Sequence, residues 1–377
     1  MDQSTRTSPL DRAKSLHGLI SEAAETSERL GRIEDGVAGA MLEARLFSIL
    51  VPERDGGLGA GRRAFFEAVE EIASADGSAG WCASVCNAVG LAASRGLPQE
   101  GRDEVFGHGP VACWTSLYPN AVVTQEPGGF RITCPGSFGS GSSLSQWVNV
   151  AGNVGAAHEG RYRAFLVPKS EVEIKAGSWD VMGLRATASL DYAITDRFVP
   201  ARLSWEYEWA PKDGGGPMSA AEGARLNAVG LSAFASGIGR RALSELIASA
   251  KKTKRVAAEG VQADDNVVQL GIGELEGRIR AARAHLVGLL EQLDDGTASD
   301  DTALDVTQAT HTLARASRDM VVFAFDHSGT SVIHARQPVQ RCLRDIFTGL
   351  KHASFTPALL GRIGKVRLGL PFGGQPL

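Results

Sequence analysis

The chain has 377 residues and a formal net charge of −4, from 39 Lys and Arg against 43 Asp and Glu. Hydrophobic residues make up 43% and charged residues 22%, which is ordinary for a globular protein with about two or three compact units. A mildly acidic chain does not attract nucleic acid or an anionic membrane surface, so neither is expected as a partner.

Targeting segments and disulfides are not expected either. The N-terminus lacks the apolar core of a secretory signal, and no apolar run approaches the length of a membrane span. The five cysteines are scattered, odd in number and without a CxxC pair. This usage favours free thiols in a reducing cytoplasm.

Residues 1–109 are predicted to form an N-terminal helical domain. Apolar residues recur at helical spacing over 9–50, 62–73 and 78–93. Between the first two helical stretches, the segment VPERDGGLGAG carries a proline and several glycines that stop the helix. The 78–93 helix is rich in alanine and glycine, which suits close packing against a flat partner.

The pattern changes at Pro110. Short runs rich in Val, Thr and aromatic residues, separated by turns such as the one at 127–129, predict strands as far as Val199. Such strands predict a β-barrel or sandwich over 110–215. The domain ends at PKDGGGP, which has the composition of a linker.

Residues 216–377 are again predicted to be helical. Long amphipathic segments cover 225–254, 265–293 and 302–325, and a last helix starts near Gln337. Helices of this length predict an antiparallel bundle. The fold class is therefore α+β and mostly α.

Several cofactor classes lack their motifs. No G-x-G-x-x-G follows a predicted strand, so NAD(P) binding through a Rossmann unit is not expected. P-loop, H-E-x-x-H and G-x-S-x-G patterns are also missing from the sequence. The eight histidines do not cluster at metal-ligand spacing, so no metal is expected.

The segment Pro135–Trp147, PGSFGSGSSLSQW, is rich in glycine and serine and lies between two predicted strands. Small residues let the backbone approach a flat ligand, and amides and hydroxyls can then donate hydrogen bonds. Composition alone favours a solvent-exposed turn. The alternative is a loop that wraps a flavin.

The last predicted helix carries a polar stripe. At about 100° per residue, six polar residues fall on one side. They are Gln337, Arg341, Arg344, Asp345, Thr348 and His352. Such a stripe either faces solvent or, if covered, lines a cofactor or substrate cleft. In the second case His352 is a proton donor or acceptor.

Four motifs resemble those of the acyl-CoA dehydrogenases and occur in the same order. They are VPERDGGLG at 51–59, WDVMGLRATASLD at 179–191, FVP at 198–200 and PVQRCLRD at 338–345. The resemblance spans nearly the whole chain. It implies N-terminal helices, a middle β-barrel and a C-terminal four-helix bundle, with a flavin between barrel and bundle and a homotetrameric assembly.

Within that superfamily the chain resembles the two-component flavin monooxygenases. Dehydrogenases often carry a Glu base about two turns after the RD pair, but here 350–355 reads LKHASF, and His352 fits the monooxygenase pattern. The segment 138–147 resembles their W.f.SG...aQW loop, with Gly136 where Trp often stands. Many of these hydroxylases have a His in the helix that here holds Cys82, Cys86 and Asn87.

That departure leaves alternatives open. The resemblance implies an oxygenase component that hydroxylates an aromatic or polyketide-like substrate. N-oxygenation of an amine or amino sugar, an acyl-CoA dehydrogenase, and a non-catalytic flavin-binding homologue remain alternatives.

The resemblance also implies the cofactors and the site. A separate NAD(P)H:flavin reductase supplies FMNH2 or FADH2, and O2 forms a C4a-hydroperoxyflavin that needs a dry, hydrogen-bonded site. The implied catalytic residues are His352 and Ser143. The implied flavin contacts are Ser140, Gly141, Ser142, Trp147, Arg344 and Asp345, with Arg255 and Gln269 reaching a neighbouring subunit's flavin. The implied substrate contacts are Trp81, Asn87 and Trp114.

Overall fold

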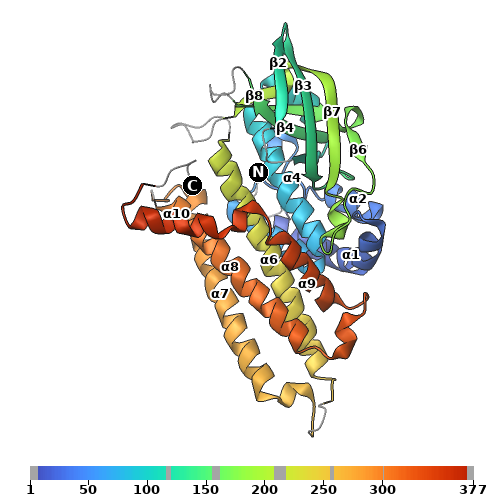
Figure 1. The fold of residues 1–377 in the computed structure, drawn as a ribbon, viewed down its shortest axis with the longest axis vertical. Helices are drawn as coiled ribbons and strands as arrows, with labels where there is room; N and C mark the ends of the chain where they lie inside the picture. Colours follow the sequence, from blue (N-terminus) through green and yellow to red (C-terminus); the bar gives the residue numbers. More distant parts are fainter. Residues whose placement is uncertain are drawn as a thin grey trace.

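The computed structural model describes residues 7–115, 120–154, 162–207, 218–254, 259–299 and 301–371. A β-sheet lies at one end of the molecule and long helices form the other end, with the N-terminal helices beside both (Figure 1). Arg255, which was predicted to contact a flavin, lies outside the described residues.

The first four N-terminal helices lie in the ranges predicted from apolar periodicity, and a fifth, α5, was not predicted. They are α1 (Pro9–Leu30), α2 (Asp35–Glu43), α3 (Arg62–Ala75), α4 (Gly77–Gly96) and α5 (Gln99–Phe106). The Ser8 side chain caps the start of α1, and Gly31 ends the helix with a φ of 66°. Asp76 caps α4 by accepting from the Ala79 amide at 2.8 Å.

Helix α4 packs unusually close to its neighbours because of two glycines. A Cβ on Gly80 would lie 2.5 Å from the Cβ of Ala73 on α3. A Cβ on Gly77 would lie 2.9 Å from both an Asp345 carboxylate oxygen and the Ile238 side chain. The glycines therefore fix both the depth and the rotation of α4.

The strands form one mixed eight-stranded sheet. Its members are β1 (Cys113–Thr115), β2 (Ala121–Glu126), β3 (Gly129–Gly139), β4 (Trp147–Asn153), β5 (Tyr162–Pro168), β6 (Glu173–Lys175), β7 (Leu190–Pro200) and β8 (Ser204–Tyr207). The strand order is β6-β7-β3-β2-β4-β5-β8, and β1 pairs with β4. Because β6 and β8 end the order without pairing with each other, the sheet is open among the described residues. The β-barrel expected over 110–215 stays a prediction.

Strand β3 delivers the chain to the glycine- and serine-rich loop. It pairs with β7 along its length, with irregularities between Ile132 and Cys134 and between Gly136 and Gly139. The last predicted strand region, which ends at Val199, is mostly the single strand β7. The loop thus starts from a strand that is paired with β7 as far as Gly139, with an irregularity just before it.

The C-terminal part has three long helices and a shorter one. They are α6 (Ala220–Ala250), α7 (Asn266–Asp294), α8 (Thr302–Asp326) and α9 (Pro338–Gly349), followed by α10 (Pro357–Arg367). Helices α6, α7 and α8 lie lengthwise beside one another, and α9 packs on α6 and α8 (Figure 1). Because α9 ends at Gly349, His352 lies beyond the helix rather than on its predicted stripe.

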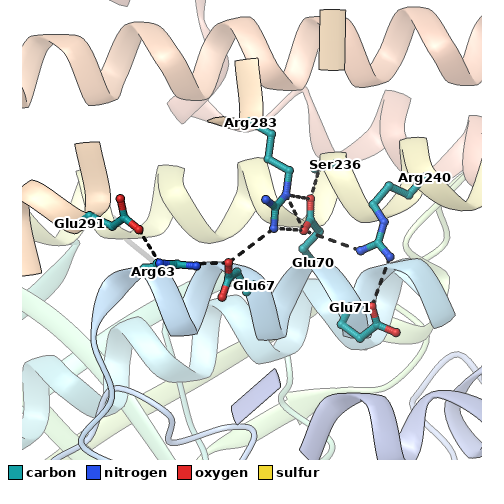
Figure 2. A network of polar contacts seen from close by, with 8 residues as sticks. All are labelled: Arg63, Glu67, Glu70, Glu71, Ser236, Arg240, Arg283 and Glu291. Atoms are coloured by element: carbon teal, nitrogen blue, oxygen red, sulfur yellow. Dashed lines mark hydrogen bonds and ion pairs between the residues drawn. The ribbon is translucent and has the colours of Figure 1, made fainter. Parts of the chain in front are cut away.

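A charged network joins α3 to the long helices (Figure 2). Glu70, only 2% exposed, accepts from Arg283 Nε at 2.9 and 3.0 Å and from Ser236 Oγ at 2.6 Å. Arg240 approaches Glu70 at 3.7 Å and Glu71 at 3.4 Å. Opposite charges thus tie the N-terminal helices to α6 and α7.

All five cysteines are buried and free. None of the helices in the described ranges is long and apolar enough to cross a membrane.

Candidate active site

The glycine- and serine-rich loop turns back on itself directly after β3. Phe138 has a φ of 58° and Gly141 a φ of 83°. The Ser140 amide donates to the Phe138 carbonyl at 2.8 Å, and the Gly141 amide donates to the Thr187 carbonyl at 2.8 Å. The Ser142 amide donates to the Gly139 carbonyl at 3.0 Å. These three amides are therefore occupied within the protein.

Four buried hydroxyls lie on the loop and the facing segment, and three of them are linked to one another; we call the four the hydroxyl cluster. Its members are Ser140, Ser142, Thr187 and Ser189. The Ser189 hydroxyl lies 2.7 Å from the Ser140 hydroxyl and 2.6 Å from the Thr187 hydroxyl. Thr187 donates to the Leu184 carbonyl at 2.8 Å, and Ser142 donates to the Ala188 carbonyl at 2.6 Å.

The segment facing the loop is held in a strained conformation. Leu184 and Ala188 have φ values of 55° and 46° and flank the 3₁₀ turn η4 (Arg185–Thr187). A left-handed backbone at a residue with a side chain costs about 1 kcal/mol or more. The Asp345 carboxylate on α9 accepts from the Leu184 amide at 2.6 Å and so helps to hold this conformation.

Asp345 is itself buried beside a second acid, Asp76. Burial, followed by the Asp76 charge, raises the pKa of Asp345 to about 7, although Arg341 opposes the shift. Burial also raises the pKa of Asp76. The junction of α4, α9 and the 184–188 segment is thus a buried region that contains two carboxyl groups with raised pKa values.

Trp81 on α4 joins the loop to the C-terminal helices. Its indole N–H donates to the Ser140 hydroxyl at 3.1 Å. Its ring meets the edges of Phe234 on α6 and of His352, with centroids 5.2 and 5.8 Å apart. The structure therefore brings together three predicted residues, Trp81, Ser140 and His352.

His352 lies on the turn after α9, before the 3₁₀ helix η8 (Ala353–Phe355). Its Nδ1 accepts from the Ser354 amide at 3.1 Å, which places the proton of the neutral ring on Nε2. Burial lowers the pKa of His352 to about 4. Near neutral pH, His352 is an uncharged ring that donates through Nε2–H.

Two predicted substrate contacts have other partners. Asn87 is fully buried: its amide donates to the carbonyls of Leu46 and Ala83, each at 2.8 Å, and its oxygen accepts from the Leu50 amide at 3.1 Å. Trp114 is also fully buried, and its ring packs on Tyr192 with centroids 4.6 Å apart. Because these side chains serve the 46–50 turn and the sheet, the geometry gives no support to substrate contact by either.

The remaining predicted site residues lie at separate places in the structure. Arg344 binds Glu28 on α1 and donates to the Met182 carbonyl at 2.8 Å. Gln269 is exposed on α7 and donates to the Ala263 carbonyl at 2.8 Å. Trp147 is half-buried at the start of β4. Ser143, predicted to be catalytic, is half-buried, and its carbonyl accepts from Lys169 at 2.8 Å. Their roles stay predictions.

Sequence reasoning missed several residues of this site. Thr187 and Ser189 stand inside the WDVMGLRATASLD motif, so a signal for them was present. Ser354, which hydrogen-bonds His352, and His311, which packs on Phe355, belong to no motif. Only the three-dimensional contact between α8 and the turn after α9 reveals them.

A separate cavity lies away from this junction. Its volume is about 400 Å³, and it opens where the end of α4, the start of α6 and the α7–α8 turn meet. Close packing of α4 against α6 separates it from Trp81, because a Cβ on Gly230 would lie 2.1 Å from the Ser84 hydroxyl. The cavity is therefore distinct from the Trp81–His352 junction.

Comparison with known proteins identifies the family. Residues 229–357 match the family described as acyl-CoA dehydrogenase, C-terminal domain. Over 381 residues the chain is 30% identical to the flavin-dependent monooxygenase, oxygenase subunit HsaA, of Mycobacterium tuberculosis, covering 94% of this chain and 93% of that protein. The chain belongs to the flavin-dependent monooxygenases. This monooxygenase is also 30% identical to the indole-3-acetate monooxygenase of Pseudomonas putida, covering 93% and 90%.

Solved structures agree. The HsaA structure superposes with a TM-score of 0.86 at 27% identity, covering 97% of this chain and 98% of that one. XiaF from Streptomyces, in complex with FADH2, superposes with a TM-score of 0.88 at 21% identity, covering 98% and 97%, and shares the fold. The monooxygenase thus has an acyl-CoA dehydrogenase-like, mostly helical fold with a sheet. It is an enzyme that uses reduced flavin and O2.

The residues of the site fit a flavin. Beside the hydroxyl cluster, Phe138 is 68% exposed and Met182 is 57% exposed, so the monooxygenase offers apolar surface to a flat ring. Phe138 meets Trp179, whose indole N–H donates to the Leu184 carbonyl at 2.9 Å. Hydroxyls and a neutral histidine beside apolar side chains match a ring with one polar edge.

Proposed function

We propose that this monooxygenase is the oxygenase component of a two-component system that hydroxylates an aromatic substrate at the junction of Trp81, Ser140 and His352. The contact that carries the proposal is that of Trp81, which hydrogen-bonds Ser140 and packs on His352 at once. The names of the relatives, an indole-3-acetate monooxygenase and a resorcinol hydroxylase, support an aromatic substrate.

One group of residues binds the flavin, and His352 donates a hydrogen bond on the other side of the site. The hydroxyl cluster and Phe138 hold the flavin edge and face, and bound reduced flavin supplies the electrons that activate O2. His352 is neutral, and its Nδ1 is occupied by the Ser354 amide. The proton of the neutral ring is therefore on Nε2, and this nitrogen donates a hydrogen bond and does not accept a proton from the substrate.

Trp81 and Phe234 keep water away from His352. Both are large rings, 8% and 0% exposed, packed edge to face. A dry site strengthens each hydrogen bond and limits loss of activated oxygen to solvent. The absence of an acidic residue from 350–355 disfavours the thioester dehydrogenase alternative.

The partners follow from the same assignment. The oxygenase-subunit names of relatives support a separate NAD(P)H:flavin reductase. A homotetramer is supported by the exposed apolar side chains Val267 (61%) and Leu270 (72%), which flank Gln269 on α7. Five free, buried thiols support a cytoplasmic location.

The test is a reconstituted reaction under ¹⁸O2. The enzyme receives reduced FMN or FAD from a flavin reductase and NAD(P)H, together with a panel of phenols, indoles and aromatic amines. One ¹⁸O atom in a ring-hydroxylated product supports the proposal. Labelled oxygen on nitrogen would redirect it to N-oxygenation. Reduction of bound oxidised flavin by an acyl-CoA, with no labelled product, would overturn it.

A further inference from the structure

His311 on α8 is a buried histidine that the proposed reaction does not use. It is 2% exposed, and its Nε2 has no hydrogen-bond partner among the described residues. A buried polar atom without a partner costs about 1–3 kcal/mol. An apolar residue of similar size would avoid that cost, so the other ring nitrogen must contribute something that an apolar residue cannot.

The other side of the ring faces the turn that carries His352. The His311 ring meets the Phe355 ring edge-on, with centroids 5.7 Å apart and planes at 71°. Burial and, after it, the charge of Arg315 lower the pKa of His311, and a weaker hydrogen bond to the Ser354 backbone acts in the opposite direction. A bond that favours the protonated ring is one that the ring donates, so the acceptor is the Ser354 carbonyl.

Ser354 is therefore held from both sides by histidines. Its amide and its hydroxyl both lie 3.1 Å from His352 Nδ1. Its backbone also interacts with His311, whose ring packs on the next residue, Phe355. The 3₁₀ helix η8 has only three residues, and its backbone contributes few bonds of its own, so side chains must fix it.

We propose that His311 is a positioning residue that orients His352 through Ser354. This inference rests on the proposed role of His352 as a hydrogen-bond donor. With His311 in place, the Ser354 amide stays aimed at Nδ1, and the His352 proton stays on Nε2. Without it, the turn is free to rotate, and Nδ1 can bind water or a proton instead.

Electrostatics leave His352 sensitive to this contact. Burial is the one cause that lowers the pKa of His352, and no charged group in the described ranges adds to it. The rings packed on it, from Trp81 and beyond it Phe234, are uncharged. The hydration and hydrogen bonding of Nδ1 therefore decide the protonation of the ring.

The experiment compares His311→Leu, His311→Asn and the control Thr310→Val. Asn retains a donor near the position of Nδ1, whereas Leu does not. Thr310 is fully buried on the same helix, and its hydroxyl donates to the Thr307 carbonyl at 2.8 Å. Replacing it by Val therefore measures the effect of a change in the interior of α8 that does not touch the turn after α9. His352 is titrated by NMR in ¹³Cε1-histidine-labelled enzyme, with its signal assigned from His352→Asn.

We expect His311→Leu to raise the pKa of His352 by about one unit or more, a tenfold gain in proton affinity. His311→Asn and Thr310→Val should leave it near the wild-type value. The fraction of O2 that appears in product should fall in His311→Leu, with KM little changed. An unchanged His352 titration in folded His311→Leu enzyme would overturn the proposal.

The two hypotheses fail separately. If His352→Asn turns over normally, the catalytic role of His352 fails, but the His311 effect on the NMR titration still tests the positioning. If the titration does not move while His352→Asn is inactive, the positioning fails and the catalytic role stands.

Discussion

Replacing Glu70 by Gln should destabilise the enzyme. The substitution keeps the size of the side chain and one acceptor oxygen, so the bond from Ser236 can survive. It removes the negative charge that Arg283 and Arg240 share (Figure 2). The new amide group also presents donors to the guanidinium of Arg283, which has no acceptor to offer.

The size of the effect follows from burial. Removing one partner of a fully buried ion pair costs about 3–5 kcal/mol. Here Glu70 is 2% exposed, but the Arg283 side chain is 32% exposed and retains Glu67 at 3.8 Å. Arg283 can thus recover part of its hydration, which reduces the expected loss of unfolding free energy to about 2–3 kcal/mol.

The assay is urea unfolding at one fixed protein concentration, because the proposed assembly would make stability depend on concentration. Glu291→Gln is the matched control, since Glu291 belongs to the same network but is 45% exposed. It should cost about 0–1 kcal/mol. A double-mutant cycle with Arg283→Met should show coupling at Glu70. A Glu70→Gln loss no larger than that of Glu291→Gln would refute the reasoning.

Further predictions concern the site, its acids and the assembly. Trp81→Phe keeps a ring but removes the bond to the hydroxyl cluster, so product formed per O2 should fall about fivefold, equivalent to about 1 kcal/mol. Trp205→Phe, whose indole N–H has no partner in the described part of the chain, should leave that ratio unchanged. The raised pKa of Asp345 stabilises the fold below pH 4, and this contribution is lost as pH rises through about 7. Asp345→Asn should therefore flatten the pH dependence of urea unfolding between pH 5 and 8, and an unchanged slope would contradict the assignment. Leu270→Glu should reduce the mass measured by light scattering, whereas Leu368→Glu, 74% exposed near the C-terminus, should not.

Much of the fold could be predicted from the sequence because its helices are long and periodic. Helices α3, α4, α6, α7 and α8 begin and end within a few residues of the predicted ranges. The sheet was harder to predict. Alternation of apolar residues identifies strands, but closure into a barrel depends on the pairing of distant edges, and here β6 and β8 do not pair with each other.

The candidate site was predictable only where local sequence determines it. The glycine- and serine-rich loop stood out by composition, but its amides turned out to bind the protein itself. Helical periodicity placed His352 on α9, whereas the helix ends at Gly349 and the turn decides the direction of the ring. Asn87 and Trp114 are of residue types that suit a substrate site, but both are fully buried, so their contact with substrate stays a prediction.

The close approach of α4 at Gly77 and Gly80 has a consequence for how relatives of this enzyme can diverge. Inserting or deleting one residue before Trp81 would rotate the rest of the helix by about 100°. The glycines would then no longer face Ala73 and Asp345, and side chains would collide with α3 and α9. New specificities on this scaffold should therefore arise by exchanging the side chain at position 81, at constant helix length. Alignments of relatives should show no gap across 77–81.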